Sequence, residues 1–111
     1  MRIFFFIFIS IVSFSSLANR VESIGTIQKL YTYSEQPGFD GDVAIVVTNP
    51  GPGCEGGYWL RKSNTEGYRN TVSFLLSAFH ANATVQFGAI STEVWSGSSA
   101  KFCRLDQIAL I

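Results

Sequence analysis

The chain has 111 residues, 47% of them hydrophobic, with eight basic and eight acidic side chains. This length permits one domain, and a net charge of zero argues against binding DNA or RNA through the overall electrostatic field. The apolar residues are unevenly spread, because residues 1–18 hold 13 of the 52. Among the remaining 93 residues 39 are apolar, which is ordinary for a soluble globular domain.

The first 18 residues have the order of a secretory signal peptide. Arg2 supplies a positive charge, residues 3–14 are almost all Phe, Ile and Val, and small residues precede Asn19. The apolar run, about 12 residues, is shorter than the roughly 20 that a membrane-spanning helix needs. We therefore expect cleavage after Ala18, a secreted or periplasmic protein without membrane insertion after cleavage, and one mature domain over residues 19–111.

Cys54 and Cys103 are the only cysteines. An even number of cysteines in an exported protein indicates a disulfide bond. Metal binding by these thiols would need further Cys or His ligands, and His80 is the only histidine. A bridge would close a loop of roughly 50 residues, which stabilises the fold by about 4 kcal/mol on the chain-entropy estimate.

The first half of the mature chain has the pattern of short strands separated by turns. We expect residues 19–23 to be a polar, frayed start and Gly25 to be a bulge in the first strand. Residues rich in β-branched and aromatic side chains predict three strands, over 24–33, 42–48 and 58–61. Pro and Gly predict turns at 34–41 and 49–57, and the second turn lacks the Lys-Ser/Thr of a phosphate-binding loop.

A helix is predicted near residues 65–81. Ser63 and Glu66 have capping-box spacing, with Ser63 as the N-cap. Asn82 is placed to end the helix in left-handed geometry. Four apolar residues at helical spacing predict the buried face: Val72, Leu75, Leu76 and Phe79.

Two more strands are predicted after the helix, over residues 84–89 and 101–110, with a loop over 90–100. In the last strand Cys103 and Leu105 share one face, whereas Ile108 and Leu110 share the other. A bulge near Asp106 would place both pairs in the core.

The predicted order is β-β-β-α-β-β, so the fold class is mainly β with one helix. A helix between the third and fourth of five short strands is the order of an OB-fold, a five-stranded small barrel closed by one helix. An open α+β sheet with one helix is the alternative.

Short matches scattered over residues 24–110 resemble a known family. They are Gly57-Tyr-Trp-Leu, the capped helix with Leu75-Leu76 and Ala78, Val85-Gln-Phe-Gly and the late Cys103. This layout resembles the B subunits of AB5 toxins of the subtilase-cytotoxin and pertussis-like group, and the small secreted bacterial proteins related to them. The resemblance implies an OB-fold, sugar binding, a homo-oligomer (a pentamer) and a catalytic partner subunit. The toxin subunits often have more cysteines, and their sugar-contacting loop does not align, so no binding residue is carried over.

Few residues are suited to catalysis, and we expect no enzyme activity, no cofactor and no metal site. His80 is the only side chain with an ordinary pKa near 7, and the predicted helix dipole accounts for its place in the last turn. The acidic residues are scattered singly. Asp40 and Asp42 form the closest pair, and two carboxylates are fewer than the six to eight oxygens that calcium takes, so a solvated turn is the expected role.

Binding has better support, because the mature chain holds 11 aromatic residues. Aromatic faces beside polar groups suit sugars. The candidate ligand-binding residues are Tyr33 with Ser34 and Glu35, and the two tryptophans, Trp59 and Trp95. The alternative for both tryptophans is a structural role in a small core.

The sequence therefore favours an exported binding module for a glycan or a cell-surface receptor. The alternative is a non-catalytic structural, accessory or inhibitor-type secreted protein with no small-molecule ligand. OB-folds also bind single-stranded nucleic acid with aromatic residues in a basic groove. The mature chain has seven basic and eight acidic residues, so we expect no nucleic-acid partner.

Overall fold

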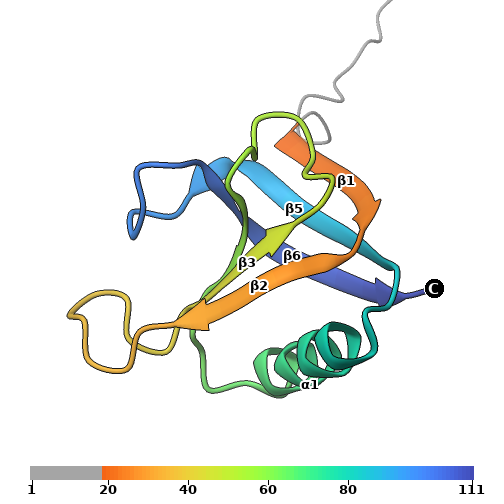
Figure 1. The fold of residues 1–111 in the computed structure, drawn as a ribbon. Coiled ribbons are helices and arrows are strands. Elements are labelled where there is room, and N and C mark those ends of the chain that lie inside the picture. The colour runs from red at the N-terminus through yellow and green to blue at the C-terminus, as the bar shows by residue number, and fades with distance from the viewer. Residues whose placement is uncertain (1–18) are drawn as a thin grey trace, which may run out of the picture.

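A computed structural model describes residues 19–111, and the predicted signal peptide lies outside the described residues. The domain is mainly β with one helix, as the sequence predicts (Figure 1). The elements are β1 (Arg20–Gly25), β2 (Ile27–Thr32), β3 (Val43–Val47), β4 (Gly57–Leu60), α1 (Glu66–Ala81), β5 (Val85–Val94) and β6 (Phe102–Leu110).

All six strands belong to one sheet, in the order β1-β5-β6-β4-β3-β2. Every neighbouring pair is antiparallel except β4 and β6, which are parallel. Only Thr26 separates β1 from β2, so the two edge strands of the sheet are consecutive in the chain. Figure 1 shows β2 and β3 passing in front of β5 and β6, with α1 lying along one end of the sheet.

The prediction of five strands is wrong, because the segment predicted as a frayed start and one strand forms two. β1 pairs with β5, whereas β2 pairs with β3, so the chain changes partner at Thr26. The Thr26 N–H donates to Oγ1 of Thr48 over 3.0 Å, and the Thr26 carbonyl accepts from the Thr48 N–H. Within residues 19–111 no strand pairing joins the two edges of the sheet.

The bulge in this segment also differs from the prediction. Gly25 pairs regularly with Val85, and the register shifts instead between Ile27 and Lys29. One extra residue on β2 reverses the faces that follow it. Ile27 and Leu30 therefore face the main core, whereas Tyr31 packs on the other side of the sheet.

β5 is longer than predicted, since it continues to Val94 through residues expected in a loop. The predicted bulge in β6 is confirmed: Gly88 pairs with Gln107 and Ala89 with Leu105, which leaves Asp106 as the extra residue. Leu110 is nevertheless 45% exposed, so the bulge does not bring it into the core.

The helix is confirmed, but it begins two residues later than the predicted cap implies. Thr65 is the N-cap, with extended backbone (φ −125°, ψ 161°), and its side chain accepts from the Tyr68 N–H. Asn82 ends the helix in left-handed geometry (φ 50°), as predicted. The buried face contains Leu75 and Ala78, whereas Leu76 and Phe79 are exposed.

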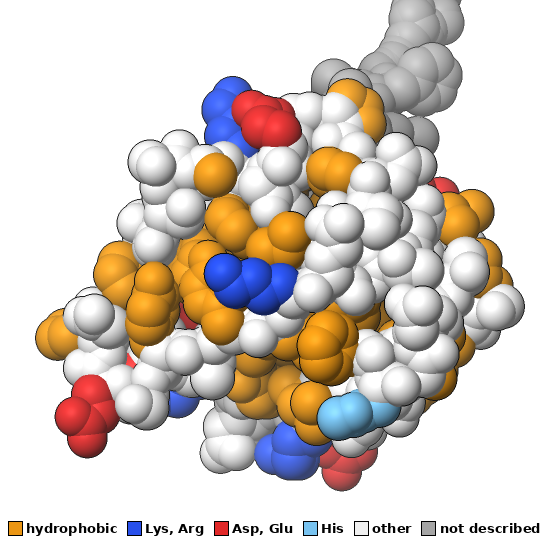
Figure 2. Space-filling view, viewed as in Figure 1, with side chains coloured by type: hydrophobic (Ala, Val, Ile, Leu, Met, Phe, Trp, Pro, Cys, Tyr) orange, Lys and Arg blue, Asp and Glu red, His pale blue; other side chains and the backbone are white. Residues whose placement is uncertain are grey.

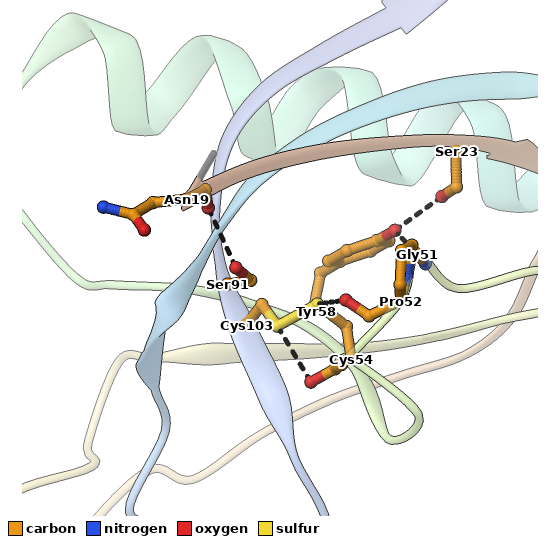
Figure 3. The surroundings of a disulfide bond; sticks show 9 residues. Asn19, Ser23, Gly51, Pro52, Cys54, Tyr58, Ser91 and Cys103 are labelled. Atoms are coloured by element: carbon orange, nitrogen blue, oxygen red, sulfur yellow. Dashed lines mark hydrogen bonds between the residues drawn. A yellow bond between two sulfur atoms is a disulfide. The ribbon is translucent and has the colours of Figure 1, made fainter. Parts of the chain in front are cut away.

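The main core lies between the inner face of the sheet and α1. Its largest fully buried side chains are Tyr58, Phe87, Ile45, Leu75 and Val85. The predicted disulfide between Cys54 and Cys103 is present there, with both residues 0% exposed. It joins the Gly-rich loop before β4 to β6. Beside it, the Tyr58 hydroxyl accepts from the Gly51 N–H and bonds to the Ser23 hydroxyl, which fixes that loop against β1 (Figure 3).

Hydrophobic side chains form a band across one face of the molecule, over β2 and between β2 and the helix (Figure 2). Among the described residues, no helix is long and apolar enough to cross a membrane.

Candidate functional site

A second group of aromatic side chains packs outside the main core, and we call it the aromatic cluster. Trp95 lies at its centre, and its buried members are Ala44, Trp59, Trp95 and Phe102. Three partly buried rings surround Trp95: Tyr31, Tyr33 and Phe39. The Tyr33 ring stacks on the Trp95 ring with a centroid distance of 6.0 Å, and Phe39 and Phe102 meet it edge-on at 6.0 and 5.5 Å.

Asp42 is the only polar or charged residue among the buried residues described, with 7% exposure. One oxygen of its carboxylate, Oδ2, accepts from the indole N–H of Trp95 over 3.1 Å and from that of Trp59 over 3.3 Å. The other oxygen, Oδ1, accepts from the backbone N–H of Lys62 over 2.9 Å. A buried carboxylate with three donors is well satisfied, so Asp42 fixes both indoles and the chain after β4 in one arrangement.

The turn before β3 is held by backbone hydrogen bonds. The N–H groups of Phe39 and Asp40 both donate to the Gln36 carbonyl, and the Gly41 N–H donates to the Tyr33 carbonyl. Gly41 has φ +88°, and a Cβ there would lie 2.5 Å from Cδ of Lys62. Glycine at position 41 therefore permits both the left-handed backbone and the close approach of Lys62.

A pocket opens beside the two indoles, and we call it the indole pocket. Its volume is about 380 Å³, which is within the range of small-molecule sites. It is lined by Gly38, Asp40, Asp42, Trp59, Arg61, Lys62, Val94, Trp95 and Ser96. The pocket therefore combines indole edges with carboxylate, guanidinium, ammonium and hydroxyl groups.

The charged side chains around this pocket are paired. Nζ of Lys62 lies 3.4 Å from Oδ2 of Asp40. Glu93 accepts from Arg61 over 3.1 Å and from Nε of Arg104 over 2.6 Å. The hydrogen bond from Arg104, with the positive charge of both arginines, lowers the pKa of Glu93 below its ordinary value. The guanidinium of Arg61 also lies 5.9 Å from the centre of the Trp59 ring.

Tyr31 marks the partly exposed side of the aromatic cluster. Burial raises the pKa of its hydroxyl, and the neighbouring Tyr33 adds to the shift. The ammonium of Lys29 lies 5.0 Å from the Tyr31 ring centre, a cation–π distance. The neutral phenol is therefore the stable form at neutral pH.

The structure brings only some of the predicted binding residues together. Trp59 and Trp95 line the indole pocket, but they are 8% and 3% exposed, so a ligand would reach ring edges rather than open faces. Tyr33 stacks on Trp95 without lining the pocket. Ser34 and Glu35 are exposed in the turn and are outside the pocket lining.

Four charged residues of the pocket were missed from the sequence as binding candidates: Asp40, Asp42, Arg61 and Lys62. The expectation of a solvated turn is wrong for Asp42, because the two indole N–H groups and the Lys62 N–H satisfy it in the interior. The available signal was its position directly before a buried β-branched strand. The tryptophans that reach it are 17 and 53 residues away in the chain, which no local pattern reveals.

Among residues 19–111, no group of three or more metal-ligating side chains is found. Comparison of the chain with protein-family models, with curated protein sequences and with solved structures gives no match.

Proposed function

We propose that the mature domain is an exported binding module that recognises a glycan or a cell-surface partner. The observation that carries the proposal is the composition of the indole pocket. Sugars are bound by aromatic surface together with groups that donate to and accept from hydroxyls, and this pocket offers Asp40, Arg61, Lys62 and Ser96 beside two indole edges.

The strand pairing supports an OB-fold-like arrangement as part of this proposal. β1 and β2 are consecutive and lie at opposite ends of the sheet order, and each pairs with a different neighbour. One long first strand, broken at Thr26, would then complete a barrel of five strands with the helix between the third and fourth. The residues after β3 contact the chain at and before that break, because Thr48 bonds to Thr26 and the Asn49 side chain donates to the Ile24 carbonyl of β1, which favours this wrapping.

Export and assembly complete the proposal. A buried disulfide is typical of proteins that fold in an oxidising compartment, which supports secretion or a periplasmic location. The resemblance to toxin B subunits adds a homopentamer and a catalytic partner subunit. Sedimentation equilibrium of the mature protein tests the assembly: a ring has five times the monomer mass, and a strict monomer would remove the toxin-like part of the proposal.

One observation favours the second candidate, an accessory or inhibitor-type protein with no small-molecule ligand. Trp59 and Trp95 are buried and their indole N–H groups are both used by Asp42. This is the arrangement of a structural cluster, and on this alternative the indole pocket stays empty.

A glycan array with the folded, oxidised mature chain separates the two candidates. Arg61 lines the pocket with an exposed side chain, so the Arg61→Ala variant should fold and lose most binding. Tyr33→Ala tests the contribution of the partly exposed ring. Phe79→Ala is the matched control, because Phe79 is an exposed apolar residue on α1 outside the pocket lining. If the unaltered protein binds no glycan on the array, the accessory role replaces the proposed one.

A further inference from the structure

A second pocket shares one lining residue, Arg61, with the indole pocket. We call it the helix pocket; its volume is about 340 Å³, and it lies between the chain after β4, the first turns of α1 and β6. The residues that matter here are Arg61, Ser63, Gly67, Thr71, Arg104 and Asp106. Residues of the segment 59–65 line both pockets, so the two pockets meet at this segment.

Arg61 is suited to contact a ligand from both sides. A guanidinium has five N–H donors in a planar fork. Among the described residues, the only side-chain hydrogen bond of Arg61 is from Nη2 to Glu93. The side chain of Arg61 is 57% exposed, so its remaining N–H groups are accessible.

The charges around the two pockets cancel. Three acidic and three basic side chains line them: Asp40, Asp42, Asp106, Arg61, Lys62 and Arg104. Each acidic side chain already has a partner within the protein, namely Lys62, the two indoles and Arg20. Because the charges cancel, a charged ligand gains no net attraction from the two pockets, whereas a hydroxyl both donates and accepts and can join the existing pairs as they are.

We propose that the two pockets are adjacent subsites for an uncharged oligosaccharide of at least two sugar residues, with Arg61 between them. This inference rests on the proposed glycan-binding function and names the ligand class. Each pocket is near the lower limit of about 300 Å³ for small-molecule sites, so a ligand that occupies both gains contacts that a single sugar residue cannot make.

Gly67 allows the helix pocket to be filled without damage to the fold. It lies in the first turn of α1, and a Cβ there would have no neighbour closer than 3.9 Å, the Oγ1 of Thr65. The Gly67→Gln variant should therefore fold and add a side chain at a residue that lines the helix pocket. Phe79→Ala is again the control, since Phe79 lines neither pocket.

The test is isothermal titration calorimetry of the oxidised mature chain with three matched pairs of neutral sugars. The pairs are galactose and lactose, N-acetylglucosamine and N,N′-diacetylchitobiose, and glucose and maltose. One or two additional hydrogen bonds correspond to an affinity about tenfold higher for a disaccharide than for its monosaccharide. Gly67→Gln should remove this tenfold advantage and Phe79→Ala should retain it.

Three results would overturn the inference while leaving glycan binding intact. The first is equal affinity for a disaccharide and its monosaccharide, and the second is full disaccharide affinity in Gly67→Gln. The third is a tenfold loss of affinity between about 0.05 and 0.5 M NaCl, because screening of this size marks a charged ligand. If neither the glycan array nor any of the six sugars gives binding, the proposed function fails together with this inference.

Discussion

The main core and the aromatic cluster of this domain are held together by different interactions. The main core is filled by aliphatic residues, Tyr58 and Phe87, and is sealed by a disulfide that is fully buried. The aromatic cluster is held together by one carboxylate, Asp42, and it borders a pocket lined with charged groups. On the proposed function, this difference is a division of roles, in which the main core stabilises the fold and the aromatic cluster shapes a surface for recognition.

The largest loss of stability is expected when the disulfide of the main core is removed. The Cys54→Ala, Cys103→Ala double variant loses a cross-link between residues 49 positions apart. The chain-entropy estimate gives a loss of about 4 kcal/mol in the free energy of unfolding, measured by urea denaturation of the oxidised protein and the variant. A loss below about 1 kcal/mol would mean that the core does not depend on the bridge.

The next largest loss of stability is expected for Asp42, whose carboxylate holds the aromatic cluster together as the disulfide holds the main core. Asp42→Ala leaves two indole N–H groups and the Lys62 N–H without their acceptor. An unsatisfied buried donor costs about 1–3 kcal/mol, so we expect a loss of about 3 kcal/mol with a shift in tryptophan fluorescence. Asp40→Ala is the matched control, since the exposed pair with Lys62 contributes at most about 1 kcal/mol. Equal losses in the two variants would contradict the role of Asp42.

A smaller effect is expected at Gly97, which packs on Trp95. A Cβ at Gly97 would lie 2.5 Å from Cε2 and Cζ2 of the indole. Gly97→Ala should therefore lower the free energy of unfolding by about 1–3 kcal/mol, the usual cost of overpacking. Gly67→Ala should act in the opposite direction, because alanine stabilises a helical position by roughly 0.5–1 kcal/mol over glycine. Thermal denaturation of both variants measures whether each one loses or gains stability. An unchanged stability of Gly97→Ala would show that Trp95 is loosely packed.

The smallest effect concerns the ion pairs beside the pocket. Because Arg104 lowers the pKa of Glu93 in the folded state, the pair stabilises the fold above the ordinary glutamate pKa of about 4.3. This stabilisation is lost as the pH falls through the lower folded pKa. The melting temperature of the unaltered protein, relative to Glu93→Gln, should therefore decline only below about pH 4.3. A difference that is constant from pH 3 to pH 7 would exclude this linkage.

The parts of the fold that local patterns determine were predicted from the sequence. The helix, its left-handed end at Asn82, the bulge at Asp106 and the disulfide all follow from the types and spacing of neighbouring residues, or from the cysteine count. The break at Thr26 was missed, because only pairing with two distant strands distinguishes β1 from β2. The N-cap was misplaced because Ser63 and Thr65 both have hydroxyls, and only the backbone geometry selects Thr65.

The candidate site was predicted only in part, for a similar reason. Trp59 and Trp95 could be named as aromatic residues at strand ends, and the structure places both in the wall of one pocket. Their common partner Asp42, and the charged residues Arg61 and Lys62, become neighbours through sheet pairing between β3 and β4. Ser34 and Glu35, chosen because they follow Tyr33 in the sequence, lie outside the pocket lining.

Chemical-shift mapping of oxidised residues 19–111 with a glycan that binds on the array tests the division of roles most directly. Amide resonances of Asp40, Lys62 and Ser96, which line the indole pocket, should shift on binding. Those of Ile45 and Phe87 in the main core should not. Shifts confined to other parts of the surface, or no shift with any glycan, would contradict the account of the aromatic cluster as a recognition site.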